Sequence, residues 1–156
     1  MVLGEVFSPN AIIVDLQSED KEEVIAELVE QLVAHIPGAD RSQLLSSVLN
    51  REEKMSTGIM PGIAIPHGKS ETLNGIHGVI GISRSGIDFD SLDGKPTYLF
   101  LLIISSTNES ERHLFVLKRL AQILENKSFY KEIMEQKSPS DIHRVLVRYE
   151  DQLGAV

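Results

Sequence analysis

Hydrophobic and polar positions along the chain change their period twice. Residues 11–16 form a short run rich in β-branched side chains, which predicts a strand. Apolar residues then recur every three or four positions in two segments separated by a Pro-Gly pair, which predicts two helices. We expect Ser18 to cap the first helix. Asp40 or Ser42 should begin the second helix, which should end near Met55.

The middle of the chain has the pattern of strands. Eight of the eleven glycines lie between positions 58 and 94, where they mark turns and close backbone approaches. Short β-type runs lie between them at residues 63–65 and 76–83. Residues 98–105 are a continuous apolar run, typical of a strand that is buried on both faces. This segment therefore predicts three strands.

The last third of the chain returns to helical spacing. Asn108 or Ser110 is the expected cap of a long helix. A short helix should follow over residues 129–135, and Ser138, followed by a proline, should begin the last helix. The order is strand, two helices, three strands and three helices. It predicts an α/β fold with a mixed sheet, in a single domain over residues 1–156.

Composition narrows the classes of function. The 156 residues carry a net charge of −8, with no cysteine and no tryptophan. The missing cysteines exclude a disulfide scaffold, a cysteine-ligated zinc site and a thiol nucleophile. An acidic chain without a basic stripe is not expected to bind nucleic acid. No apolar run approaches the roughly 18 residues of a membrane span, and the first residues do not resemble a signal peptide. We therefore expect a soluble cytoplasmic protein without membrane insertion.

Five histidines are the side chains whose ordinary pKa lies nearest neutral pH. We interpret His35 as structural, His77 as a residue in a cross-strand or exposed position without a functional role, and His143 as a solvated surface residue. His67 stands between a proline and a glycine at the end of a short strand, an open position on a stiff backbone; the alternative is a loop histidine without a role. His113 falls on the buried stripe of its helix, where the macrodipole disfavours protonation; the alternative is a satisfied core histidine.

Arg51 and the hydroxyls of Ser56 and Thr57 complete a candidate site. Arg51 shares a helix face with apolar residues, so it either satisfies carbonyl or carboxylate groups or offers its planar guanidinium to a phosphate. Imidazole is a nucleophile toward phosphorus, and guanidinium and hydroxyl groups are donors to phosphoryl oxygens. No nucleotide-binding loop, zinc-ligand spacing or serine-hydrolase elbow accompanies them. We therefore expect phosphoryl chemistry without a metal or a cofactor.

Residues 56–67 read Ser-Thr-Gly-Ile-Met-Pro-Gly-Ile-Ala-Ile-Pro-His. This stretch resembles the signature of the enzyme IIA domains of the bacterial phosphoenolpyruvate:sugar phosphotransferase system, fructose/mannitol type, which includes the nitrogen-regulatory enzyme IIA. Arg51 and the helix around His113 fit the same pattern, and the resemblance covers essentially the whole chain. Met60 is a difference, because the family often has a small residue there, and it bears on the shape of the loop before the site.

The resemblance implies a three-layer α/β/α sandwich and a phosphotransferase with a phosphohistidine intermediate. His67 would accept a phosphoryl group from the phosphocarrier HPr and pass it to an enzyme IIB partner for sugar uptake. His113 would lie beside it and stabilise charge, and Arg51 would clamp the phosphoryl oxygens, with Thr57 and Ser56 as weaker candidates for phosphoryl binding. The alternative is a nitrogen-regulatory enzyme IIA, a protein-binding switch controlled by phosphorylation of His67. The three matching side chains argue against a fold relative that transfers nothing.

Overall fold

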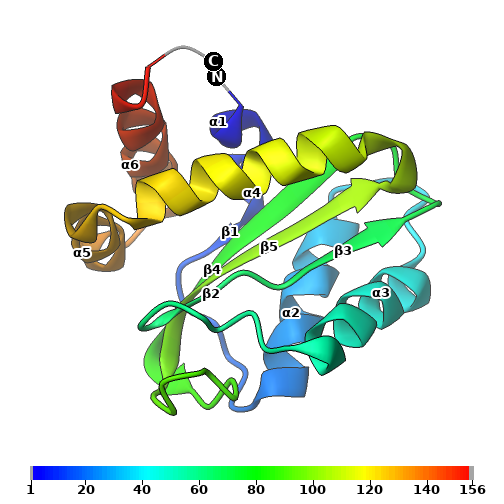
Figure 1. Ribbon diagram of the computed structural model, residues 1–156, viewed down its shortest axis with the longest axis horizontal. Helices are drawn as coiled ribbons and strands as arrows, with labels where there is room; N and C mark the ends of the chain where they lie inside the picture. Colours follow the sequence, from blue (N-terminus) through cyan, green and yellow to red (C-terminus); the bar gives the residue numbers. More distant parts are fainter. Residues whose placement is uncertain (1, 155–156) are drawn as a thin grey trace.

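A five-stranded mixed sheet lies between two layers of helices in the computed structural model, which describes residues 2–154 (Figure 1). The elements in chain order are α1 (Leu3–Val6), the 3-10 turn η1 (Pro9–Ala11), β1 (Ile12–Ile13), α2 (Lys21–Val33), α3 (Arg41–Lys54), β2 (Ile63–Ala64), β3 (His67–Ser70), β4 (Ile76–Ile87), β5 (Thr97–Ser106), the 3-10 turn η2 (Thr107–Glu109), α4 (Ser110–Leu124), α5 (Lys127–Glu135) and α6 (Pro139–Gln152). The α/β class and the three-layer sandwich expected from the sequence are confirmed.

β5 is the strand on which the sheet is built. It pairs antiparallel with β4, which pairs in turn with the parallel strand β1. On its other side β5 pairs with β2 and then with β3, both parallel to it. Ile63 lies opposite Leu99 and His67 lies opposite Ile103, so the two short strands keep one register along the same edge. β2 and β3 are therefore a single line of strand interrupted for two residues.

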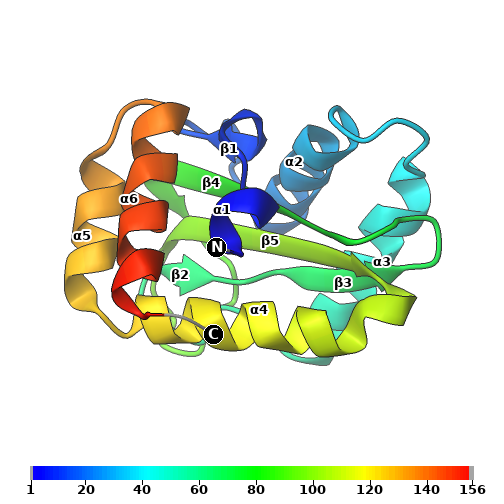
Figure 2. The same ribbon diagram turned by 90° about the horizontal axis from the view of Figure 1, so that it is seen from above.

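The side chains of β5 alternate between the two helical layers, as the pleat of a strand requires. Leu99, Leu101 and Ile103 belong to the core beneath α1, α4, α5 and α6. Phe100, Leu102 and Ile104 belong to the core shared with α2 and α3. The view from above shows α4 running lengthwise beside β2 and β3, with α5 and α6 at one end of the sheet (Figure 2). All six of these β5 side chains are fully buried.

Two of the expected helix caps are wrong. Asp20, and not Ser18, caps α2, because its carboxylate accepts the Glu23 N–H at 2.9 Å. The Ser18 hydroxyl donates instead to the Glu27 carboxylate at 2.6 Å. α4 begins after η2 with no side-chain cap of its own, so neither of the two expected residues caps it. The caps at Asp40 and Ser138 are confirmed by their bonds to backbone N–H groups in the first turns of α3 and α6.

Besides the two 3-10 turns, one helix and one strand of the fold were not expected. α1 has four residues, too few to show a helical period in the sequence. β3 has the sequence His-Gly-Lys-Ser, without a β-branched or apolar side chain, and it forms because its backbone pairs with the buried strand β5. The structure therefore has four strands between the helical segments, where three were predicted. Among residues 2–154, no helix combines the length and the apolarity that crossing a membrane requires.

A buried ion pair joins α4 to α6 and to both ends of the described chain. The Arg119 Nε donates to the Glu150 carboxylate at 2.9 Å, and the two side chains are only 11% and 1% exposed. The other oxygen of Glu150 accepts the Leu3 N–H at 2.9 Å, and Arg119 donates to the Gly154 carbonyl at 2.8 Å. The pair therefore fixes the position of α4, the helix that carries His113.

We expect Glu150→Ala to lower the free energy of unfolding by roughly 3–5 kcal/mol, because it leaves the Arg119 charge buried without its partner. Arg144→Ala is the control, since it removes one partner of the exposed pair with Asp141 and should change stability by about 1 kcal/mol or less. Urea unfolding of both variants measures the difference. Equal losses in the two variants would contradict the structural role assigned to Glu150.

Candidate active site

His67 and His113 face one shallow pocket at the edge of the sheet. His67 is the first residue of β3, and His113 lies in the first turn of α4. Their ring centroids are 5.6 Å apart, with an angle of 57° between the ring planes. The pocket has a volume of about 460 Å³, and it is lined by Ser47, Asn50, Arg51, Lys54, His67, Gly68, Lys69, His113 and Leu117. Three of the predicted site residues are thus brought together.

The backbone fixes which nitrogen of His67 carries a proton. Nδ1 lies 2.8 Å from the Ile65 carbonyl oxygen. A carbonyl oxygen only accepts hydrogen bonds, so Nδ1 is the protonated nitrogen and the neutral ring keeps a lone pair on Nε2. Burial lowers the pKa of His67, the bond to Ile65 acts against this, and the positive charge of Arg51 lowers it further. At pH 7 the neutral ring is therefore favoured, and its Nε2 lone pair is free to act as a nucleophile toward phosphorus.

His113 is the more strongly shifted of the two histidines. It is 5% exposed, and burial together with the neighbouring His67 and Lys69 lowers its pKa to about 4. Its Nδ1 lies 2.5 Å from the hydroxyl oxygen of Ser105 in β5. When that hydroxyl donates to Nδ1, the proton of the neutral ring is on Nε2, which is then a donor. The expected position on the buried stripe of the helix is confirmed, and the lowered pKa, which favours a neutral ring, comes from burial and the neighbouring His67 and Lys69.

Cations line this pocket and carboxylates do not. Arg51, Lys54 and Lys69 contribute three positive groups, although the chain as a whole carries a net charge of −8. Arg51 Nη1 donates to the Met55 carbonyl at 2.9 Å, and Lys69 Nζ donates to the Ser110 hydroxyl at 2.8 Å. Neither group has a carboxylate partner among the ion pairs of the described residues. The pocket is therefore suited to an anion.

A glycine allows the arginine helix to approach the histidine strand. At Gly68, an ideal Cβ would lie 2.6 Å from the Ser47 hydroxyl oxygen and 3.2 Å from the Val48 backbone nitrogen in α3. The Ser47 hydroxyl donates to the Lys69 carbonyl at 2.6 Å and accepts the Lys69 N–H at 2.9 Å. α3 and β3 are thus held in direct contact. This contact brings Arg51, one turn after Ser47, to the pocket that His67 faces.

Ser56 and Thr57 are not brought to this pocket. The Thr57 hydroxyl donates to the Glu52 carboxylate at 2.6 Å. The Ser56 hydroxyl donates to the Phe89 carbonyl at 3.1 Å and accepts the Gly58 N–H at the same distance. Their hydroxyls hold the turn in place, and neither residue lines the space between the histidines.

The sequence interpretation missed Lys69, Ser105 and Glu52. Lys69 lies two residues after His67, so recognition of β3 would have placed both on one face of a strand. Glu52 is 5% exposed and follows Leu44 and Val48 at helical spacing, which was a signal for burial. Ser105 ends an apolar run, and its partner His113 lies on another element, so no local pattern identifies it.

The remaining histidines lie outside the pocket. His35 at the end of α2 makes a hydrogen bond to the Gln31 carbonyl, in keeping with the structural role expected of it, and His77 in β4 makes one to the Asn74 carbonyl. His143 was expected at the solvated surface, and this is wrong. Its Nε2 donates to the Gly4 carbonyl at 2.9 Å and its side chain is half-buried, because α1 packs against α6.

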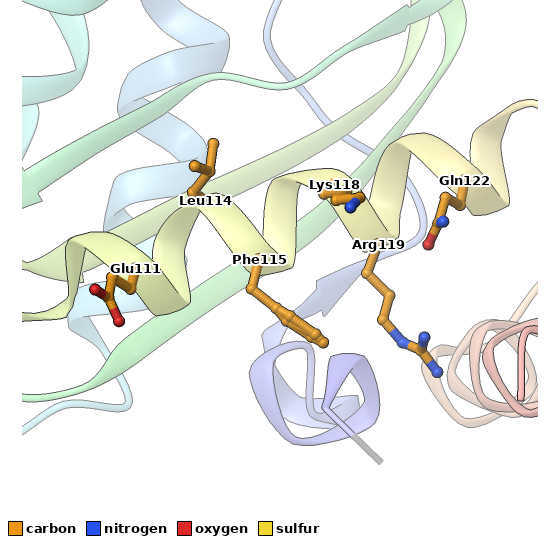
Figure 3. A pocket seen from close by; sticks show the side chains of 6 residues that line it. All are labelled: Glu111, Leu114, Phe115, Lys118, Arg119 and Gln122. Carbon is orange, nitrogen blue, oxygen red and sulfur yellow. The ribbon is translucent and has the colours of Figure 1, made fainter. Parts of the chain in front are cut away.

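A second hollow lies along the outer side of α4 (Figure 3). It has a volume of about 480 Å³ and is lined by Glu111, Leu114, Phe115, Lys118, Arg119 and Gln122. All six residues come from one helix, and its arginine is already paired with Glu150. This hollow contains no imidazole, the nucleophile toward phosphorus that the site requires, so the pocket between the two histidines is the better candidate for that chemistry.

The depressed pKa of His113 predicts how stability responds to acid. The unfolded chain takes up a proton near pH 6.5, whereas the folded chain resists protonation of His113 until about pH 4. The unfolded state therefore binds more protons between these values, and stability falls as the pH is lowered through them. We expect a loss of about 2 kcal/mol between pH 7 and pH 5 from this residue alone. His113→Gln should lose less over the same interval, as measured by urea unfolding at both pH values; equal losses would contradict the assignment.

Both the fold and the sequence of this chain match known proteins of one class. The nitrogen regulatory protein IIA-Ntr from Neisseria meningitidis has the same fold, with a TM-score of 0.87 at 27% identity over 94% of this chain and 99% of that chain. Residues 5–149 match the family described as phosphoenolpyruvate-dependent sugar phosphotransferase system, EIIA 2. The chain belongs to this family, which confirms the resemblance inferred from residues 56–67.

Two kinds of relative are similar to this chain in sequence. The fructose-specific EIIABC component of the phosphotransferase system of Bacillus subtilis is 33% identical over 150 residues, which are 96% of this chain and 24% of that protein. A nitrogen regulatory protein of Bradyrhizobium diazoefficiens is 30% identical over 146 residues, which are 94% of this chain and 95% of that protein. The chain thus spans about a quarter of the first relative and nearly all of the second.

Proposed function

We propose that this protein is a phosphocarrier that accepts a phosphoryl group on Nε2 of His67 from phosphorylated HPr and passes it to an enzyme IIB. One observation carries the proposal. The bond from His67 Nδ1 to the Ile65 carbonyl leaves Nε2 as a bare nucleophile, beside a pocket with three cations and no carboxylate. The sequence of residues 1–156 is, in this proposal, one enzyme IIA domain.

The transfer needs no proton at the attacking atom. The lone pair of His67 Nε2 forms the new P–N bond as the P–N bond of the donor histidine breaks, and the donor ring recovers its electron pair. The phosphoryl oxygens then lie in a pocket with the guanidinium of Arg51 and the ammonium of Lys69, both fixed donors. His113, protonated on Nε2 when Ser105 donates to Nδ1, supplies a neutral donor.

The charge of the protein favours a particular kind of partner. The chain carries −8, and a phosphoryl group adds further negative charge. A donor or acceptor with a basic docking face would be steered toward this acidic protein, and their association would slow as salt is added. The cationic pocket itself attracts the phosphoryl group that the donor presents. This pattern supports a phosphorylated protein as the donor.

The second candidate function is that of a nitrogen-regulatory enzyme IIA, in which phosphorylation of His67 switches the binding of a target protein. It is supported by the nitrogen regulatory relative, which is 30% identical over 94% of this chain, and by the TM-score of 0.87 with the IIA-Ntr structure. Both candidates use the same acceptor histidine. They differ only in the fate of the phosphoryl group, which is either released to an enzyme IIB or retained as a signal.

The test is the intact mass of the protein after incubation with phosphoenolpyruvate, enzyme I and HPr. We expect one acid-labile phosphoryl group. Addition of an enzyme IIB of the fructose or mannitol type should then discharge it. A protein that stays phosphorylated beside several such domains supports the regulatory alternative. No phosphoryl group on this protein, with HPr shown to be charged, would contradict both.

A further inference from the structure

We propose that Glu52 is a positioning residue that holds both His67 and Arg51 in place through the turn at residues 55–58. The proposal rests on the proposed function for its effect on transfer, and on the contacts of Glu52 for the positioning itself. Glu52 does not line the pocket of the two histidines. In this proposal it acts from behind the pocket, on the backbone whose carbonyl groups bond to the side chains of His67 and Arg51.

Glu52 is a buried carboxylate with three donors. Its Oε2 accepts the Thr57 N–H at 2.7 Å, and its Oε1 accepts the Thr57 hydroxyl at 2.6 Å. Lys21 of α2 supplies an ammonium 3.2 Å from Oε2, and this ammonium also lies 4.6 Å from the centre of the Phe89 ring. Short bonds to an ionised acceptor are among the stronger hydrogen bonds in proteins. Thr57 is therefore tied firmly to the last turns of α3.

The first arm of the network leads from Thr57 to His67. The Thr57 carbonyl accepts the Ile65 N–H at 3.3 Å. The Ile65 carbonyl accepts the Nδ1–H of His67 at 2.8 Å. Pairing with β5 holds the neighbours of Ile65, Ala64 and Pro66, and the bond to Thr57 holds Ile65 itself. A shift of Thr57 therefore moves the carbonyl that selects the protonated nitrogen of His67. Loss of that bond would let the proton occupy Nε2, which blocks the nucleophile.

The second arm leads from the same turn to Arg51. The Met55 carbonyl, two residues before Thr57, accepts the Arg51 Nη1–H at 2.9 Å. α3 ends at Lys54 and the backbone of Met55 is extended, so the direction of this carbonyl depends on where the following residues are anchored. These residues are anchored at Thr57, whose N–H and hydroxyl both donate to the Glu52 carboxylate. One carboxylate thus fixes the backbone that orients a nucleophile and the backbone that orients a cation.

This arrangement gives the threonine of the Ser-Thr-Gly turn a role other than phosphoryl binding. Its hydroxyl and its N–H both point to Glu52, and its carbonyl points toward the strand that leads to His67. Thr57 is therefore the link between the buried carboxylate and the nucleophile. A role in stability alone predicts that variants of Glu52 unfold more easily while the tautomer of His67 is unchanged.

The experiment compares Glu52→Ala, Glu52→Gln and Thr57→Val with the native protein. Glu53→Ala is the matched control, because it removes the same charge from the next, exposed position of the helix. The first measurement is the 15N spectrum of the His67 ring at pH 7.5, which reports the tautomer without any phosphoryl donor. We expect one tautomer, with Nδ1 protonated, in the native protein and in Glu53→Ala, and a mixture in Glu52→Ala. Glu52→Gln, which keeps an acceptor for one Thr57 bond, should be intermediate.

The second measurement is the initial rate of phosphorylation by phosphorylated HPr. A reacting group displaced by about 1 Å costs on the order of 100-fold, so we expect a 10- to 100-fold loss in Glu52→Ala and no loss in Glu53→Ala. A folded Glu52→Ala with the native tautomer and a rate within about twofold of native would overturn the proposal. If Glu52→Ala does not fold, Thr57→Val decides in the same way, since it removes only the hydroxyl bond. If the tautomer shifts in Glu52→Ala but HPr does not phosphorylate even the native protein, the positioning role is kept and the proposed function is rejected.

Discussion

His67→Ala is expected to take up no phosphoryl group under conditions in which the native protein is fully charged. The reason lies in the ring of His67. Its proton is on Nδ1, in the bond to the Ile65 carbonyl, so the lone pair of Nε2 is free to attack phosphorus. His113 does not replace it, because it is buried and its Nδ1 is engaged with Ser105. Intact mass after incubation with phosphoenolpyruvate, enzyme I and HPr measures the loss.

The control for this variant is His35→Ala, which removes an exposed imidazole at the end of α2, away from the pocket. It should be charged at the native rate. Urea unfolding of His67→Ala should show that the variant is folded, since His67 is only half-buried. A phosphoryl group on a folded His67→Ala would show that another residue is the acceptor.

Arg51→Met should slow phosphorylation by about 100- to 1,000-fold, the effect of removing a fixed donor to charge that develops in a transition state. The guanidinium is held by the Met55 carbonyl at 2.9 Å and so needs little rearrangement to meet the phosphoryl oxygens. Its removal also raises the pKa of His67, because Arg51 contributes to lowering it. The initial rate at pH 7.5, where the ring stays neutral, isolates the loss of the donor from the change in protonation.

Lys54→Met is the variant against which the loss of rate in Arg51→Met is compared. Lys54 also lines the pocket, but its side chain is exposed, so its charge is screened by solvent. We expect a loss of about tenfold or less, mainly through weaker attraction of the donor. Comparable losses in Arg51→Met and Lys54→Met would mean that the arginine contributes net charge and no specific contact.

The sequence predicted the elements whose signal is repeated along the chain. α2, α3 and α6 each bury a stripe of apolar residues, and β5 is buried on both faces, as its unbroken apolar run indicated. β3 could not be predicted in this way, since its four residues are polar or glycine and its strand geometry comes from pairing with β5. The same limit applies to α1, which is held by tertiary contacts with α6 and β4.

The candidate site was predictable where a histidine or an arginine lay in an unusual local setting. His67, His113 and Arg51 all line one pocket, although 62 positions separate the first residue of this set from the last. Lys69 escaped notice because its strand, β3, has no apolar pattern by which it could be recognised. Glu52 escaped notice because it stands among other charged residues of α3, and charged side chains are mostly exposed. Their surroundings depend on which elements the fold brings together.

The pocket is assembled from all three layers. β3 is at the edge of the sheet, α3 reaches it from one face, and α4 reaches it from the other. A unit that folded with only one helical layer would lack either the arginine or the second histidine. The ability to accept a phosphoryl group is therefore a property of the complete tertiary structure, and it should vanish along the same denaturation curve as the global fold.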